Sequence, residues 1–195
     1  GDAGGPAFGG AAEALIDGFG VTGSLSGGGV SVWDQVHDLV ISNNTFRSNQ
    51  GNHGGGVTIG SPDLITSNTG VIIRHNRIIK NSGVRGAGGV AVYTGGDGYQ
   101  VVDNFISGNL SRFHGGGLMH FGLSDGGLIA GNEISFNEVF WGGQIGGDGG
   151  GVFVGSQTDL EDPAELADGS GTVTIDDFES GTIAEVLERA GHKCV

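Results

Sequence analysis

Short segments with alternating apolar and polar positions recur along the chain, each directly after a glycine-rich turn. Such segments are too short for helices, and apolar residues at every second position are typical of β-strands that bury one face. We therefore predict a short strand after each of five turns, within residues 27–32, 54–59, 88–92, 115–120 and 149–154.

A second pattern lies between these turns. It consists of an apolar strand, an asparagine, an apolar residue two positions later and another asparagine three positions after that. Four copies occur, within residues 39–49, 71–81, 101–109 and 128–137. The first asparagines of the copies are Asn44, Asn76, Asn104 and Asn132, and the last glycines of the turns are Gly29, Gly56, Gly89, Gly117 and Gly151. Both series advance by a nearly constant step, which predicts a solenoid with one repeat per coil.

The length and composition of the repeat select one kind of solenoid. A propeller blade needs about 40–45 residues, and a leucine-rich repeat needs a leucine scaffold that this unit lacks. In a parallel β-helix each strand pairs with its equivalent in the next coil, about 4.8 Å away. Asn44, Asn76, Asn104 and Asn132 are then expected to form an inward ladder of hydrogen-bonded amides.

These motifs resemble those of a known group of proteins. The glycine-glycine-apolar turns and the Phe46-x-x-Asn49 element are similar to the GGxx and FxxN repeats of polymorphic outer-membrane and autotransporter passenger proteins, and more widely to the pectin-lyase-like superfamily. The resemblance covers about residues 15–155. It implies a right-handed parallel β-helix of about four to five coils, but no single activity, because that superfamily includes lyases, hydrolases, adhesins and scaffold modules.

Composition supports an all-β fold with a hydrophobic core. Glycine and proline make up 47 of the 195 residues, which approaches low-complexity composition, but leucine, isoleucine, valine and phenylalanine contribute 53. Isoleucine and valine outnumber leucine by 32 to 11, and their branched side chains favour strands. The single cysteine, Cys194, cannot form an internal disulfide.

Charge and hydropathy exclude two classes of partner. The chain has 22 acidic and 8 basic residues, a formal net charge of −14, which argues against nucleic-acid binding. It contains no run of about 18 apolar residues, so no membrane-spanning segment is expected.

The chain divides into three parts by composition. Residues 1–14 are rich in glycine and alanine and are expected to be loose or a partial cap, and residues 15–158 form the β-helix. Residues 159–195 form an acidic tail that holds −8 of the −14 charges. Within the tail the repeat decays near residues 171–176, and residues 182–191 have the spacing of a short helix that could cover the end of the solenoid.

Two sets of charged residues are candidates for catalysis or metal binding. His75 and Asp103 each precede a ladder asparagine, so they are expected on adjacent coils as a general acid–base pair or as a solvated ion pair. Asp97 and Asp125 are separated by the same step along the chain and are candidate Ca²⁺ ligands or plain turn residues. The first set has three further outward members: Arg74, Arg77 and Glu133.

The histidines beside the glycine turns form no evident metal centre. His53 and His114 are predicted two coils apart, too far to share a zinc ion. His114 and Asp148 are expected on adjacent coils, but they supply only two ligands. His120 occupies an apolar position of the repeat and is expected inside the core with a hydrogen-bond partner.

Alternation along the strands after the glycine turns directs several aromatic residues outward. Aromatic rings of this kind stack on sugars and anchor protein partners. Alternatively, loops such as residues 109–114 and 137–147 fold over these rings and bury them. The predicted ligand-binding residues are Trp33, Tyr93, Phe121 and Phe153.

From these observations the expected function is that of a non-catalytic extracellular or cell-surface scaffold or adhesion module. It would bind a polysaccharide or a cell-surface partner, form part of a larger secreted or surface protein, and need no cofactor other than, in one alternative, Ca²⁺. The competing hypothesis is a polysaccharide lyase or glycoside hydrolase that uses the His75 and Asp103 side or the Asp97 and Asp125 turns.

Overall fold

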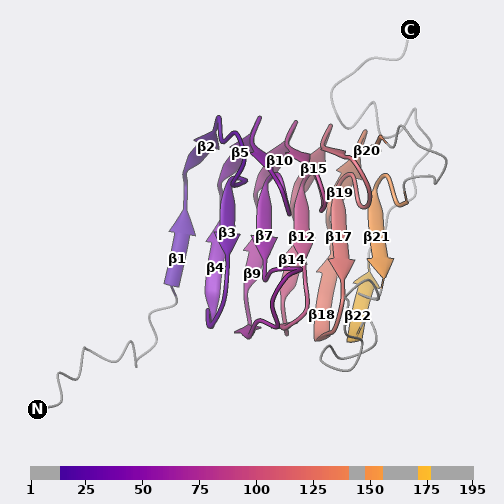
Figure 1. Ribbon diagram of the computed structural model, residues 1–195. Helices are drawn as coiled ribbons and strands as arrows, with labels where there is room; N and C mark the ends of the chain where they lie inside the picture. The colour runs from indigo at the N-terminus through magenta and orange to yellow at the C-terminus, as the bar shows by residue number, and fades with distance from the viewer. Residues whose placement is uncertain (1–13, 141–147, 156–170, 177–195) are drawn as a thin grey trace, which may run out of the picture.

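The chain forms a parallel β-solenoid of about four turns (Figure 1). The computed structural model describes residues 14–140, 148–155 and 171–176. Within these residues, every pairing of strands between coils is parallel. None of the described residues is helical. The all-β solenoid predicted from the repeat is therefore confirmed.

Four sheets run along the solenoid and take one strand from most coils, and a fifth sheet joins two strands only. Sheet A contains β1 Ala14–Asp17, β4 Leu39–Ser42, β9 Ile72–Arg74, β14 Gln100–Val102, β18 Ser124–Ala130 and β22 Gly171–Asp176. Sheet B contains β2 Gly20–Thr22, β5 Thr45–Arg47, β10 Arg77–Ile79, β15 Phe105–Ser107 and β19 Glu133–Ser135. Sheet C contains β6 Gln50–Gly51, β11 Ser82–Gly83, β16 Leu110–Ser111 and β20 Glu138–Val139. Sheet D contains β3 Val30–Val32, β7 Val57–Ile59, β12 Val90–Val92, β17 Leu118–Phe121 and β21 Val152–Gly155, and sheet E contains β8 Asn68–Thr69 and β13 Gly96–Asp97.

The core consists of rows of apolar side chains that repeat from coil to coil. In sheet A, Ile41 pairs with Ile73, Ile73 with Val101, and Val101 with Ile129, and all four side chains are buried. Similar rows come from sheets B and D. Because every coil places the same residue type at the same register, the interior is filled without long side chains crossing it.

The asparagine ladder is confirmed. The Oδ1 atom of Asn76 accepts hydrogen bonds from the main-chain N (2.9 Å) and the Nδ2 (3.0 Å) of Asn44, and Asn104 accepts the equivalent pair from Asn76. Asn132 continues the series from Asn104. A second ladder at the next bend has the same pattern: Asn49, Asn81, Asn109 and Asn137.

In four of the five turns, the glycine before the last one lies tightly against the backbone of the neighbouring coil. A Cβ atom on Gly88 would lie 2.6 Å from the main-chain N and O atoms of Leu110 and from the O atom of Gly116. Gly55 and Gly116 have equally little space. The glycine runs are therefore explained by close backbone packing beside sheet C.

Sheet A extends into the segment expected as an acidic tail. The strand β22 lies beyond residue 158, yet it pairs with β18. Its apolar Val173 packs against the core, which explains why this short stretch rejoins the solenoid despite its acidic surroundings. The predicted helix at residues 182–191 and the N-terminal segment before Ala14 lie outside the described residues. Among the described residues, no helix has the length and apolar character needed to cross a membrane.

Candidate functional site

The outer face of sheet D carries a second, smaller apolar cluster. Alternation correctly places Ala91 and Met119 on this face, but both are buried because chain from the turns folds back over them. Ala87, which comes from the segment between β11 and β12, belongs to this cover. Tyr93 is only 1% exposed, so the alternative of loop cover applies to it and its ring is not presented to solvent.

Aromatic rings continue from this cluster along the solenoid axis. Tyr93 meets Phe121 edge to face with ring centroids 6.3 Å apart, and Phe121 lies 6.2 Å from Phe153. The His114 ring stacks on Phe153 at 4.6 Å, and the His53 ring contacts Tyr93 at 6.2 Å. We call these five residues the outer aromatic row. Phe121, Phe153 and His114 are half-buried, so part of each ring is exposed to solvent. Phe121 and Phe153 pack against the buried cluster beneath them.

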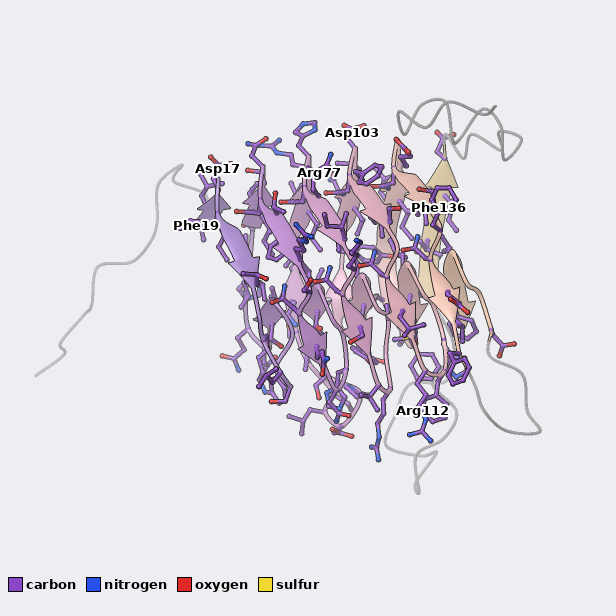
Figure 2. The ribbon with its side chains drawn as sticks, turned by 90° about the horizontal axis from the view of Figure 1, so that it is seen from above. Asp17, Phe19, Arg77, Asp103, Arg112 and Phe136 are labelled. Carbon is purple, nitrogen blue, oxygen red and sulfur yellow. The ribbon has the colours of Figure 1, made fainter. Side chains whose placement is uncertain are left out.

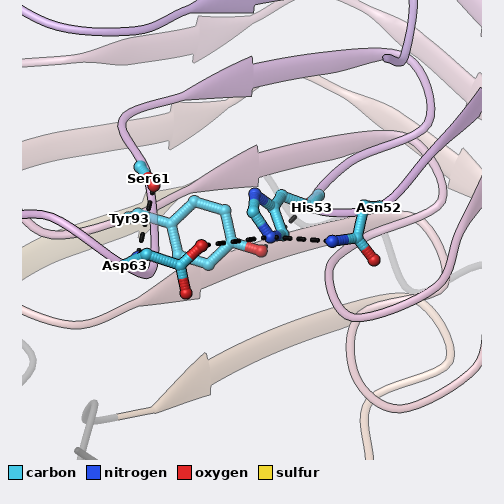
Figure 3. Close-up of polar contacts among 5 residues, drawn as sticks. All are labelled: Asn52, His53, Ser61, Asp63 and Tyr93. Atoms are coloured by element: carbon cyan, nitrogen blue, oxygen red, sulfur yellow. Dashed lines mark hydrogen bonds and ion pairs between the residues drawn. The ribbon is translucent and has the colours of Figure 1, made fainter. Parts of the chain in front are cut away.

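A polar cluster surrounds His53, at one end of the outer aromatic row (Figure 3). The His53 Nε2 atom lies 3.1 Å from Asn52 Nδ2 and 3.6 Å from a carboxylate oxygen of Asp63. The Tyr93 hydroxyl donates a 2.7 Å hydrogen bond to the main-chain O of His53. The main-chain N of Asp63 donates to the buried Ser61 Oγ, which shapes the turn that carries the carboxylate.

The His53 cluster predicts a pH dependence of stability. Burial lowers the pKa of His53, Arg85 lowers it further, and Asp63 opposes both. The unfolded chain then binds a proton near the ordinary histidine pKa of 6.5 while the folded protein does not, so stability is lost as the pH falls through that value. We expect the free energy of unfolding to fall more steeply between about pH 7.5 and 5.5 in the wild type than in His53→Gln. Urea denaturation across this range measures how the free energy of unfolding changes with pH in each protein. The other five histidines are the same in both, so a difference between the two slopes is due to His53. Equal slopes would contradict the prediction.

The other end of the row pairs His114 with Asp148. Their Nδ1 and Oδ2 atoms are 3.5 Å apart, and the two residues form a parallel bridge, as expected for adjacent coils. No third acidic, histidine or cysteine ligand joins this pair or any other pair in the described part of the chain. The pair therefore offers one carboxylate and one imidazole at the edge of the rings.

Trp33 does not extend the row. It is 50% exposed and shares the register of Tyr93, but Gly60 occupies the equivalent position of the coil between them. Because glycine has no side chain, no ring of that coil joins Trp33 to Tyr93, and a Cβ atom on Gly60 would lie 2.8 Å from Thr66 Oγ1. The sequence pattern thus predicted the outward direction of Trp33 correctly and could not show that one coil leaves the strip interrupted.

The first catalytic candidates do not converge. His75 and Asp103 have left-handed backbones (φ 54° and 53°) at equivalent bends and are both exposed, but no ion pair within 4.0 Å joins them among the described residues. The carboxylate of Asp103 leans toward Gly131 on the following coil. Figure 2 shows Asp103 at the same edge of the solenoid as Arg77 and Asp17.

Asp97 in β13 and Asp125 in β18 are linked by a hydrogen bond from coil to coil. An Asp97 carboxylate oxygen accepts a 2.9 Å hydrogen bond from the main-chain N of Asp125, and the Thr172 hydroxyl donates to Asp125 at 3.3 Å. These contacts confirm the predicted adjacency of the two aspartates. They also assign each carboxylate a partner in the next coil, as the asparagines have in their ladders.

His120 is a core residue, as predicted. It is fully buried, and its Nδ1 atom lies 2.9 Å from the Tyr99 hydroxyl. Burial raises the pKa of the Tyr99 phenol well above its ordinary value, so Tyr99 stays neutral. Sequence reasoning missed this partner and the contact between His53 and Asp63, because neither pair is separated by one repeat length.

The comparisons leave the family open: the chain matches no protein-family model, no curated protein and no solved structure.

Proposed function

We propose that this chain is a non-catalytic β-solenoid module of an extracellular or cell-surface protein, and that it binds a saccharide at the outer aromatic row. The contact network of His53, Tyr93, Phe121, His114 and Phe153 carries the proposal. Its membership in the pectin-lyase-like superfamily and its right-handed winding, which parallel β-crossovers favour, are parts of the same proposal.

The support beneath the rings suits them to binding. Phe121 and Phe153 pack on the buried Tyr93 and Met119, so they lose little conformational freedom when a ligand covers them. Aromatic rings held in this way provide large contact areas for the apolar faces of sugar rings. A row that runs across several coils also matches a ligand that is a chain.

Polar groups stand at both ends of the row. The side chains of Asp63 and Asp148 are 62% and 63% exposed, and each lies beside a histidine of the row. Carboxylates accept hydrogen bonds from hydroxyl groups, which sugars supply in pairs. Rings for the apolar faces and acceptors for the hydroxyls are the two kinds of contact that a saccharide needs.

A glycan array probed in the presence of Ca²⁺ identifies the ligand. With the best oligosaccharide from the array, we expect Phe121→Ala and Phe153→Ala each to weaken binding by about tenfold or more, which corresponds to about 1.4 kcal/mol. Phe136→Ala is the matched control, because Phe136 is exposed and lies outside the row. Isothermal titration calorimetry measures the three dissociation constants.

The results also separate the proposal from its alternative. If the row variants bind as tightly as Phe136→Ala does, the row is not the binding site. If the oligosaccharide is cleaved and cleavage is lost on His114→Ala, the polysaccharide lyase or hydrolase hypothesis replaces the module. The contact between His114 and Asp148 is the observation that keeps this alternative open.

A further inference from the structure

Cations gather on the outer face of sheet B and at the adjoining end of β9 in sheet A. Arg47 ends β5, Arg77 begins β10, Arg74 ends β9 just before the bend, and Lys80 follows β10 directly. All four side chains are exposed, and together they are half of the eight lysines and arginines of the chain. In a chain of net charge −14, this concentration on two adjacent coils is unexpected from composition.

The register brings two of these cations close together. Thr45 pairs with Arg77 and Arg47 pairs with Ile79, so Arg47 and Arg77 are diagonal neighbours on one face of the sheet, roughly 7–8 Å apart. Phe46 precedes Arg47 and Ile78 follows Arg77, and both apolar side chains are fully buried. Because successive side chains of a strand point to opposite faces, both arginines point outward.

Two of the cations pack against residues of the next coil. The Arg77 guanidinium lies over the Phe105 ring, 4.9 Å from its centroid. A Cβ atom on Gly108 would lie 3.7 Å from Lys80 Cγ, so Lys80 also leans onto that coil, at a position without a side chain. A guanidinium that rests on a ring keeps the N–H groups on its edge for a ligand.

No carboxylate forms an ion pair with this face within the described residues. None of the four cations has a carboxylate oxygen within 4.0 Å or a side-chain hydrogen bond there. Glu133 lies in the same row of sheet B as Arg77, two coils away beyond Phe105, and the Asp103 carboxylate leans toward the following coil. Asp17 accepts hydrogen bonds of 2.7 Å from Ser42 Oγ and Asn43 Nδ2. These two hydrogen bonds lower the pKa of Asp17 more than the charge of Arg74 does.

We propose that Arg47, Arg74, Arg77 and Lys80 form a basic face that binds the sulfate or phosphate esters of an anionic saccharide. Each guanidinium presents five N–H donors and the ammonium three. An ester of sulfate or phosphate has three terminal oxygens and suits a convergent set of such donors. At physiological ionic strength, electrostatic fields are screened over about 8 Å. An anionic ligand at this face therefore interacts more strongly with the nearby cations than with the net negative charge of the molecule.

This face is separate from the outer aromatic row, since it lies on sheet B and the adjoining end of β9 in sheet A, and the row lies on sheet D. Figure 2 shows Arg77 and Arg112 at opposite sides of the solenoid. The two sites can therefore be tested independently.

The experiment compares sulfated dextran oligosaccharides with unsulfated oligosaccharides of the same length by isothermal titration calorimetry. We expect only the sulfated probe to bind, and we expect Arg47→Gln/Arg77→Gln to weaken its binding by about tenfold or more. The control is Arg85→Gln/Arg112→Gln, which removes the same formal charge from outside the face and should leave binding within about twofold. Phe105→Leu should weaken binding by several-fold, because it removes the ring under Arg77 and keeps an apolar side chain.

Further arms identify what the face binds. Phosphorylated dextran distinguishes the two esters, and binding of either one supports the proposal. Equal affinity for a polyuronate of matched charge overturns the assignment to esters, and tighter binding of single-stranded DNA overturns the assignment to a saccharide. Equal losses in both double variants show a bulk charge effect and overturn the site. Phe121→Ala should leave binding of the sulfated probe unchanged, so failure of this proposal is distinguishable from failure at the outer aromatic row.

Discussion

Asn76→Asp is expected to destabilise the solenoid by about 3–5 kcal/mol, a large part of the 5–15 kcal/mol that holds a typical domain together. The Nδ2 group of Asn76 donates to the main-chain O atoms of Ile41 (2.8 Å) and Arg74 (2.9 Å) and to Asn104 Oδ1 (3.0 Å). A carboxylate has no such donor and would place negative charge against these acceptors at a position only 1% exposed.

Urea denaturation at pH 7 measures this loss, and Asn76→Ala, which removes the same bonds without adding charge, is expected to lose less. Lowering the pH should recover part of the stability of Asn76→Asp, because a protonated carboxyl regains one donor. Asn52→Asp is the control: Asn52 is exposed, so we expect a change within about 1 kcal/mol. An unfolding midpoint of Asn76→Asp equal to that of the wild type would show that the ladder does not support the fold.

Gly88→Ala is expected to cost about 3 kcal/mol or more, although it adds a single methyl group. The added Cβ would lie 2.6 Å from the main-chain atoms of Leu110 and Gly116, and a backbone that pairs with both neighbouring coils has little room to yield. Thermal unfolding followed by circular dichroism should show a clear fall in Tm.

Gly20→Ala is the matched control for this change. Gly20 lies in β2 at the end of the solenoid, its backbone is not left-handed, and no atom of the described residues lies within 4 Å of its added Cβ. There the substitution is expected to be neutral or to stabilise by up to about 1 kcal/mol, since alanine restricts the unfolded chain. If both variants have the same Tm, close packing does not explain the glycine runs.

The candidate sites were accessible from sequence to different degrees. Pairs separated by one repeat, such as Asp97 and Asp125, are placed correctly because every coil pairs with its neighbour in the same register. The contact of His53 with Asp63 is absent from that pattern, because Asp63 reaches His53 from a turn outside the repeat. Tyr93 has the outward direction predicted for it, but it is covered by the segment that precedes its own strand and by His53 of the neighbouring coil.

The sequence by itself therefore determined the parallel solenoid, the inward rows and the asparagine ladder, because a near-constant repeat of apolar and amide positions has one register in which each residue type stacks on itself. Only the tertiary structure decided which outward residues become a site. Whether Tyr93 is covered, whether β22 rejoins sheet A, and whether the cations of sheet B find carboxylates depends on how turns of unequal length fold back over the coils. The sequences and lengths of those turns do not repeat from coil to coil, so the repeat pattern does not predict where the turns lie.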